Sequence, residues 1–169
     1  EGPDISAGVP PQTYSLKYGK DPFLPSNVKT SAGGPVNARL LAGSENCGAC
    51  HRDIYDEWEA SAHSWSATDV FYTTVAGMME DETGIESTRY CGGCHNPIPT
   101  LSGNLTAVTA KRLNAEGKTG QEALYYEEGI SCTVCHGITR VQGTKGNAAY
   151  EFTPPPRYLF ELEDGNGFL

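Results

Sequence analysis

The sequence is poor in the apolar residues from which a protein core is usually built. Only 38% of its 169 residues are hydrophobic, while it contains 20 glycines and 11 prolines. Burial of apolar surface is the main force that folds a domain, so a chain of one-domain length with this composition is short of core. No apolar stretch is long enough to span a bilayer as a helix. We therefore expect a loop-rich domain without a membrane span.

Positive charge is also scarce. Twelve lysines and arginines stand against 21 aspartates and glutamates, and the formal net charge is −9 at pH 7. Nucleic acids and anionic membranes are bound through basic patches, so this balance argues against both as partners. Electrostatic steering would favour a protein partner with a basic docking face, although a need for solubility alone also accounts for the net charge.

Cysteine and histidine are few and unevenly placed. The chain has six cysteines and four histidines, and none of them lies in residues 1–45. All six cysteines and three of the histidines follow one pattern, in which two residues separate a pair of cysteines and a histidine follows directly. The three copies are Cys47-Gly-Ala-Cys50-His51, Cys91-Gly-Gly-Cys94-His95 and Cys132-Thr-Val-Cys135-His136.

This pattern is typical of c-type haem attachment. Two thiols about one helical turn apart can both form thioethers with the vinyl groups of one porphyrin, and the adjacent histidine reaches the iron as proximal ligand. The sequence therefore predicts three covalently bound c-type haems with their iron. The attachment residues are Cys47, Cys50, Cys91, Cys94, Cys132 and Cys135, and the proximal ligands are His51, His95 and His136.

Two other interpretations of the cysteines compete with haem attachment. Three disulfides or structural zinc would also use cysteines in pairs. A disulfide framework gives no reason for a histidine after every second cysteine, and zinc ribbons group thiols in fours. Haem attachment is favoured, and three large flat cofactors would supply the apolar surface that the composition lacks. Because c-type haem is attached outside the cytoplasm, we expect a periplasmic or extracellular protein and interpret Glu1 as the start of a mature chain.

The expected fold class is mainly α with much irregular structure, in which short helices and long loops pack on haem. Residues 1–45 contain six of the eleven prolines and are predicted to form an extended N-terminal arm, which lies over the haem core or reaches a neighbouring subunit. Residues 46–169 are predicted to form the trihaem cytochrome domain, with a loop-like C-terminal segment. Aromatic residues in that segment are expected to cover haem edges; they are Tyr150, Phe152, Tyr158, Phe160 and Phe168.

Helical periodicity is clearest after the first motif. Ile54, Trp58, Ala62 and Trp65 recur every three or four residues and predict one helix over residues 53–67. Two further helices are expected over residues 105–117 and 120–128. Any strands should be short.

His63 is the one histidine outside the motifs. A lone histidine is usually a surface or packed residue, but here several irons need distal ligands, so iron ligation is favoured. If residues 51–63 form one helix, the imidazoles of His51 and His63 lie ~18 Å apart along its axis. The two axial nitrogens of one iron are only about 4 Å apart, given metal–nitrogen bonds of ~2 Å. We therefore expect His63 to bind the second or third haem.

Four histidines cannot fill the six axial positions of three irons. Met78 and Met79 are candidate ligands, because a thioether sulfur binds haem iron and raises its reduction potential. Adjacent methionines are also common core residues. The remaining possibilities are histidines donated by another cytochrome chain and an open iron.

The run from Cys47 to Ser64 resembles a known family. Its specific residues after the first motif are Ile54, Tyr55, Trp58, Ser61, His63 and Ser64. This run is similar to the multihaem cytochromes c related to the tetrahaem cytochrome of ammonia-oxidising bacteria, a group that includes hydroxylamine-oxidising enzymes and multihaem electron conduits. The segments Cys91-x-x-Cys94-His95-Asn96-Pro97 and Gly129-Ile130-Ser131-Cys132-x-x-Cys135-His136-Gly137 are similar to its later haem sites.

The resemblance implies a distal-ligand role for His63, mostly bis-histidine haems in close-packed pairs, and electron transfer. Family members usually carry a fourth haem and more distal histidines. We therefore interpret this sequence as a shortened relative or as a fragment of a longer protein.

Three functions are compatible with these observations: an electron relay between redox proteins, an enzyme acting on a small nitrogen, oxygen or sulfur species at an open haem, and a conducting unit in an assembly of chains that exchange ligands. An enzyme needs an open iron and a distal acid–base group. Once His63 is used no histidine remains for that role, and nothing distinguishes Glu80 or Asp81 from a solvated acidic loop. Electron transfer is therefore favoured over catalysis.

Overall fold

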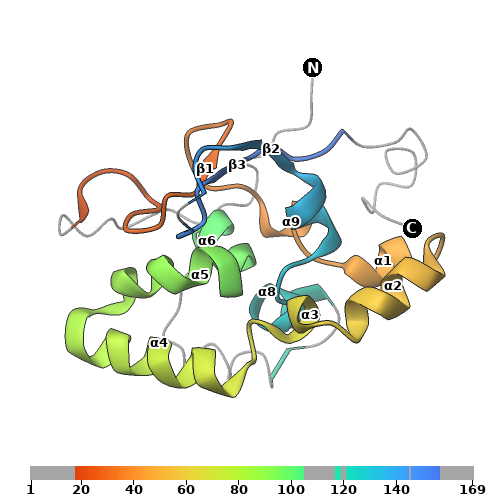
Figure 1. Ribbon diagram of the computed structural model, residues 1–169, viewed down its shortest axis with the longest axis horizontal. Coiled ribbons are helices and arrows are strands. Elements are labelled where there is room, and N and C mark those ends of the chain that lie inside the picture. The colour runs from red at the N-terminus through yellow and green to blue at the C-terminus, as the bar shows by residue number, and fades with distance from the viewer. Residues whose placement is uncertain (1–17, 105–116, 119–120, 145, 157–169) are drawn as a thin grey trace.

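The fold is described from a computed structural model of the chain, which describes residues 18–104, 117–118, 121–144 and 146–156. These residues form a mainly α structure in which short helices are joined by irregular segments, and a small sheet lies beside α5, α6 and α9 (Figure 1). The predicted fold class is confirmed.

Short helices make up most of the regular structure. In chain order they are η2 (Ala38–Leu40), α1 (Ser44–Gly48), α2 (Arg52–Glu59), α3 (Ala62–Trp65), α4 (Val70–Thr83), η3 (Ile85–Thr88), α5 (Arg89–His95), α6 (Pro97–Ser102), α8 (Gln121–Glu127) and α9 (Cys132–His136), where η denotes a 3₁₀ helix. The long helix α4 begins at Asp69, whose Oδ1 accepts from the Tyr72 amide at 2.8 Å, and ends at Gly84 with φ 91°. An aspartate N-cap and a glycine at the C-terminus are favourable ends for a helix.

The sheet joins the beginning of the described chain to its end. It consists of β1 (Lys29–Thr30), β2 (Ile138–Val141) and β3 (Tyr150–Phe152). The central strand β3 pairs in parallel with β1 and antiparallel with β2. All three strands are short, as expected.

The core lies between this sheet, the segment before α1, and α6. Its buried apolar residues are Phe23, Val28, Val36, Ala38, Leu41, Ala42, Ile98, Leu101, Val134, Ala148 and Phe152. Most of them come from two stretches of chain, residues 23–42 and α6, that are far apart in sequence. The Val36 amide donates to the Leu101 carbonyl at 2.9 Å, which fixes one stretch against the other.

Part of the segment expected to be an extended arm is therefore packed. Within residues 1–45 the structure describes residues 18–45, and there Val36 and Leu41 have no exposed surface. The apolar residues of this segment are interspersed with prolines, glycines and polar residues, so no periodic pattern in the sequence reveals them. The proposed boundary between residues 45 and 46 remains a prediction.

The helix predicted over residues 53–67 is interrupted. Helix α2 ends at Glu59, and Ser61 adopts an extended conformation (φ −89°, ψ 160°) before α3 begins. The Ser61 hydroxyl donates to the Trp58 carbonyl at 2.7 Å and accepts from the His63 amide at 3.3 Å. Serine side chains that bond to nearby backbone compete with the helix in this way. The assumption of one straight helix from His51 to His63 is therefore wrong.

The structure tests only some of the other predicted helices and haem-edge aromatic residues. Helix α8 confirms the helix expected over residues 120–128. Most of the helix expected over residues 105–117 lies outside the described residues, as do Tyr158, Phe160 and Phe168. Phe152, expected at a haem edge, is completely buried in the protein core.

Candidate haem-attachment sites

Each motif forms one turn of helix. The second motif lies in α5 and the third in α9. The first begins in α1 and continues the turn beyond it, with the His51 amide donating to the Cys47 carbonyl at 2.9 Å. Residues i, i+3 and i+4 share one face of a helix, so each motif presents both thiols and its imidazole on the same side.

The donor groups of the motifs are accessible. In every motif the first cysteine is half-buried, while the second cysteine and the histidine are exposed. All six cysteines lie in described residues, and none forms a disulfide. Among the described residues, no group of three or more His, Cys, Asp or Glu side chains is close enough to hold a metal ion. This donor set fits a group that takes two thiols and one imidazole from a single helical turn, as c-type haem does.

The first and third motifs lie side by side. A hydrogen bond with the Cys47 thiol lowers the pKa of Cys132 to about 6, against the opposing effect of burial. The Cys132 amide also donates to the hydroxyl of Ser44, at the start of α1, at 3.0 Å. Two motifs separated in sequence thus have their first sulfurs in contact.

The second motif has an aromatic neighbour on α4. The Tyr72 ring stacks on the imidazole of His95 with centroids 4.9 Å apart and an interplanar angle of 6°. Burial raises the pKa of Tyr72, and the nearby Cys91 adds to that increase. Tyr72 therefore lies against this motif.

A second tyrosine lies between the second and third motifs. The Tyr150 hydroxyl donates to the Gly93 carbonyl at 2.9 Å. Burial raises the pKa of Tyr150, and the thiols of Cys94 and Cys135 both add to that increase. A Cβ at Gly93 would lie only 2.6 Å from that of Ala148, so the close approach of the segment before β3 to α5 requires glycine.

His63 is fixed by its backbone beside the segment that leads into the third motif. Its carbonyl accepts from the Ile130 amide at 2.8 Å, and the Trp58 indole donates to the Ile130 carbonyl at 2.8 Å. The Ser66 hydroxyl is shared between the carbonyls of His63, at 3.1 Å, and His95, at 2.9 Å. The His63 side chain itself is exposed. His63 is thus bonded directly next to the third motif and through one hydroxyl to the second.

Gly129 is essential to this arrangement. A Cβ there would lie 2.2 Å from Ser66 Oγ and 2.3 Å from the His63 carbonyl oxygen. We expect Gly129→Ala to force these segments apart and to lower the free energy of unfolding by about 1–3 kcal/mol. Gly77→Ala is the matched control, since nothing lies within 4 Å of its Cβ and alanine in a helix stabilises by about 0.5–1 kcal/mol. Denaturant unfolding of the haem-loaded protein measures both, and equal stabilities of Gly129→Ala and the wild type would contradict the close contact.

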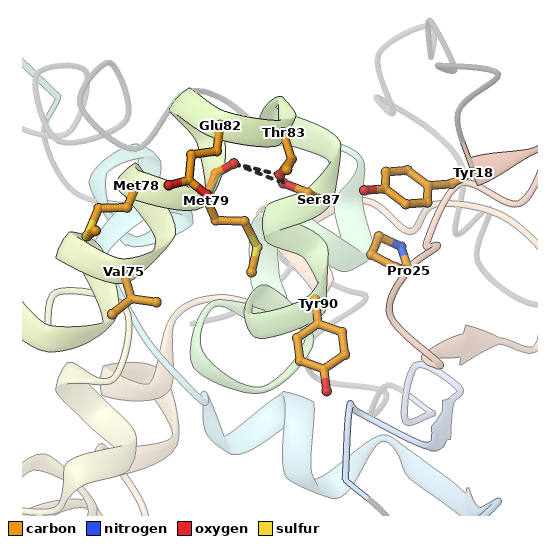
Figure 2. A pocket seen from close by; sticks show the side chains of 9 residues that line it. All are labelled: Tyr18, Pro25, Val75, Met78, Met79, Glu82, Thr83, Ser87 and Tyr90. Atoms are coloured by element: carbon orange, nitrogen blue, oxygen red, sulfur yellow. Dashed lines mark hydrogen bonds between the residues drawn. The ribbon is translucent and has the colours of Figure 1, made fainter.

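Met78 and Met79 lie at an open hollow of about 510 Å³ beside α4 and α5. In Figure 2, Met79 extends toward Tyr90 while Met78 points away from it. Met78 is 59% exposed. Tyr90 directly precedes Cys91, so the hollow adjoins the second motif. The remaining lining residues are Tyr18, Pro25, Val75, Glu82, Thr83 and Ser87.

The part of the chain that contains these sites matches a known protein family. The family described as cytochrome c554 and c-prime matches residues 46–137, a stretch that contains all three motifs and His63. The chain belongs to this family. It is therefore a c-type cytochrome, with haem iron and a function in electron transfer, as the sequence predicted. No curated protein and no solved structure matches the chain. Within the described residues, no helix of this cytochrome is both long and apolar enough to cross a membrane.

Several side chains around the motifs were not singled out from the sequence of this cytochrome. Tyr72, Ser66 and Glu128 all contact motif residues or the segments next to them. Each acts across a long sequence separation, and none belongs to a spacing pattern. The only available signal was that Glu128 directly precedes the Gly129-Ile130 pair that forms part of the family resemblance.

Proposed function

We propose that this cytochrome passes electrons through three covalently bound c-type haems between redox proteins outside the cytoplasm. The haems are held by the three cysteine pairs, with His51, His95 and His136 as proximal ligands. Haem iron supplies the one-electron redox change. The observation that carries the proposal is that three separate helical turns each present two thiols and an exposed imidazole on one side.

The contacts between motifs support an order for the relay. Cys47 and Cys132 are in hydrogen-bonding contact, so the first and third haems are attached at neighbouring points. Tyr150 lies near Cys94 and Cys135, which favours a second step between the third and second haems. We propose the spatial order first, third, second.

His63 is proposed as the distal ligand of the third haem. Its direct backbone bond to Ile130, two residues before Cys132, supports this choice over the second haem, to which His63 is linked only through Ser66. Two axial positions then remain for Met79 or Met78, or for histidines of a neighbouring cytochrome chain. An acidic protein with net charge −9 is suited to redox partners that present a basic face.

The number of haems is tested by mass. The intact mass of the denatured protein should exceed that of the polypeptide by three haems, because thioether bonds survive acid extraction. Replacing Cys91 and Cys94 together by alanine should lower the count by one and leave the other two haems attached. Metal without covalent porphyrin would contradict the proposal, and a count of one or two in the wild type would contradict the three-haem relay.

A further inference from the structure

A buried acidic side chain lies at the junction of the first and third motifs. Glu128 is only 4% exposed. Its carboxylate accepts from the Gly43 amide at 2.7 Å, from the Ser44 amide at 2.9 Å and from the Ser44 hydroxyl. The two backbone amides can only donate, so both carboxyl oxygens act as acceptors, as they do in an ionised carboxylate.

The hydroxyl of Ser44 connects this carboxylate to the third motif. It donates to Glu128 and accepts from the Cys132 amide at 3.0 Å. A second bond lies alongside, since the Ser131 hydroxyl donates to the Leu41 carbonyl. The segments 41–44 and 128–132 are therefore joined directly before the first cysteines of two motifs.

This junction fixes where the two thiols lie. Cys47 follows Ser44 by three residues within α1, and Cys132 begins α9 directly after Ser131. Because α1 and α9 are each a single short turn, the bonds at this junction help to set the positions of their sulfurs. Loss of the Glu128 carboxylate would leave the Gly43 and Ser44 amides buried without their acceptor, which is unfavourable.

Electrostatic interactions join Glu128 to Glu45 on α1, Tyr55 on α2 and Cys132 on α9, and none of these three groups carries a positive charge. Burial raises the pKa of Glu128, and its bonds from Ser44 and Gly43 oppose that increase. A nearby negative charge stabilises ferric over ferrous iron and so lowers a haem reduction potential.

We propose that Glu128 is a positioning residue that holds the first and third haem-attachment turns together and lowers the potential of the haems they carry. This inference rests on the proposed trihaem relay. Glu128 binds no haem itself; it acts through Ser44 on Cys132 and through α1 on Cys47.

The test compares Glu128→Gln with Glu127→Gln in the haem-loaded protein. Both remove one carboxylate from adjacent positions, but Glu127 is exposed and is not part of the junction. Redox titration should show a positive shift in the potential of the first or third haem in Glu128→Gln and a much smaller one in Glu127→Gln. Electron paramagnetic resonance of the oxidised protein should show altered magnetic coupling between two haems in Glu128→Gln alone. Potentials and coupling equal in the two variants would overturn the proposal.

Ser44→Ala distinguishes the positioning of the two haem-attachment turns from the effect of the negative charge of Glu128. It keeps the carboxylate and removes the hydroxyl that reaches Cys132, so the haem–haem coupling should change with little shift in potential. If Glu128→Gln does not yield folded protein, unchanged coupling in Ser44→Ala overturns the positioning role on its own. Haem mass is measured on the same samples. Fewer than three haems in the wild type would contradict the relay, whereas three haems with unaffected potentials and coupling would contradict only the role of Glu128.

Discussion

Replacing His63 by glycine is expected to convert one haem of the purified cytochrome from low spin to high spin. A distal imidazole keeps haem iron six-coordinate, and its removal leaves a five-coordinate iron with weaker-field ligation. The conversion should appear in the optical and paramagnetic resonance spectra of the oxidised protein, and added imidazole should reverse it. Ala62→Gly is the matched control, because it places the same flexible residue in α3 and keeps the imidazole.

The backbone hydrogen bond of His63 predicts which haem should change its spin state. His63 is bonded through its backbone to Ile130, two residues before the first cysteine of the third motif. Combining His63→Gly with alanine at Cys132 and Cys135 should therefore abolish the new high-spin signal, because the affected haem is no longer attached. A signal that persists until the second motif is removed would assign His63 to the second haem. A change at the first haem would contradict the arrangement of α3, and an unchanged spectrum would make His63 a structural residue.

That each motif forms one helical turn could be predicted from the sequence, because the chemistry proposed for the motifs is local. Two thiols and an imidazole must lie within one helical turn, so a fixed five-residue spacing carries the whole signal. Helix α8 was also predictable from its own residues. The fold class followed from composition, because a chain rich in glycine and proline has few long helices or strands.

The relations between the motifs could not be predicted, because they depend on contacts distant in sequence. The packing of Val36 on Leu101 and the bonds of Glu128 to Ser44 join residues that no periodicity connects. The break at Ser61 has a different cause. Apolar spacing favoured a continuous helix, but the serine hydroxyl bonds to backbone groups on both sides and ends α2 early. The position of His63 is therefore set by its contact with residues 129–130 and not by the axis of a long helix.

A second large effect is expected on the spin state of the haems, because the histidines leave axial positions of the iron unfilled. In the isolated protein at least one haem is expected to be high-spin or to carry methionine, because four histidines cannot fill the six axial positions of the three haem irons that we propose. Met79→Leu tests the methionine alternative, since leucine has a similar volume and no ligand atom. Met78→Leu is the control, because Met78 points away from Tyr90, the residue directly before Cys91 (Figure 2). A new high-spin haem in Met79→Leu alone would assign that sulfur to iron, whereas two unaltered spectra would exclude methionine ligation.

An open position would bind carbon monoxide in the reduced protein, and this reactivity distinguishes the remaining functions. If neighbouring chains donate histidines, the isolated chain should bind carbon monoxide and lose that ability when it joins its native complex. If the protein is an enzyme, the reactive haem should persist in the complex and convert a small nitrogen, oxygen or sulfur substrate. We expect the native complex to contain only low-spin haems inert to carbon monoxide that exchange electrons rapidly. If His63 is a distal ligand as proposed, no histidine remains to act as an acid or base at an open iron.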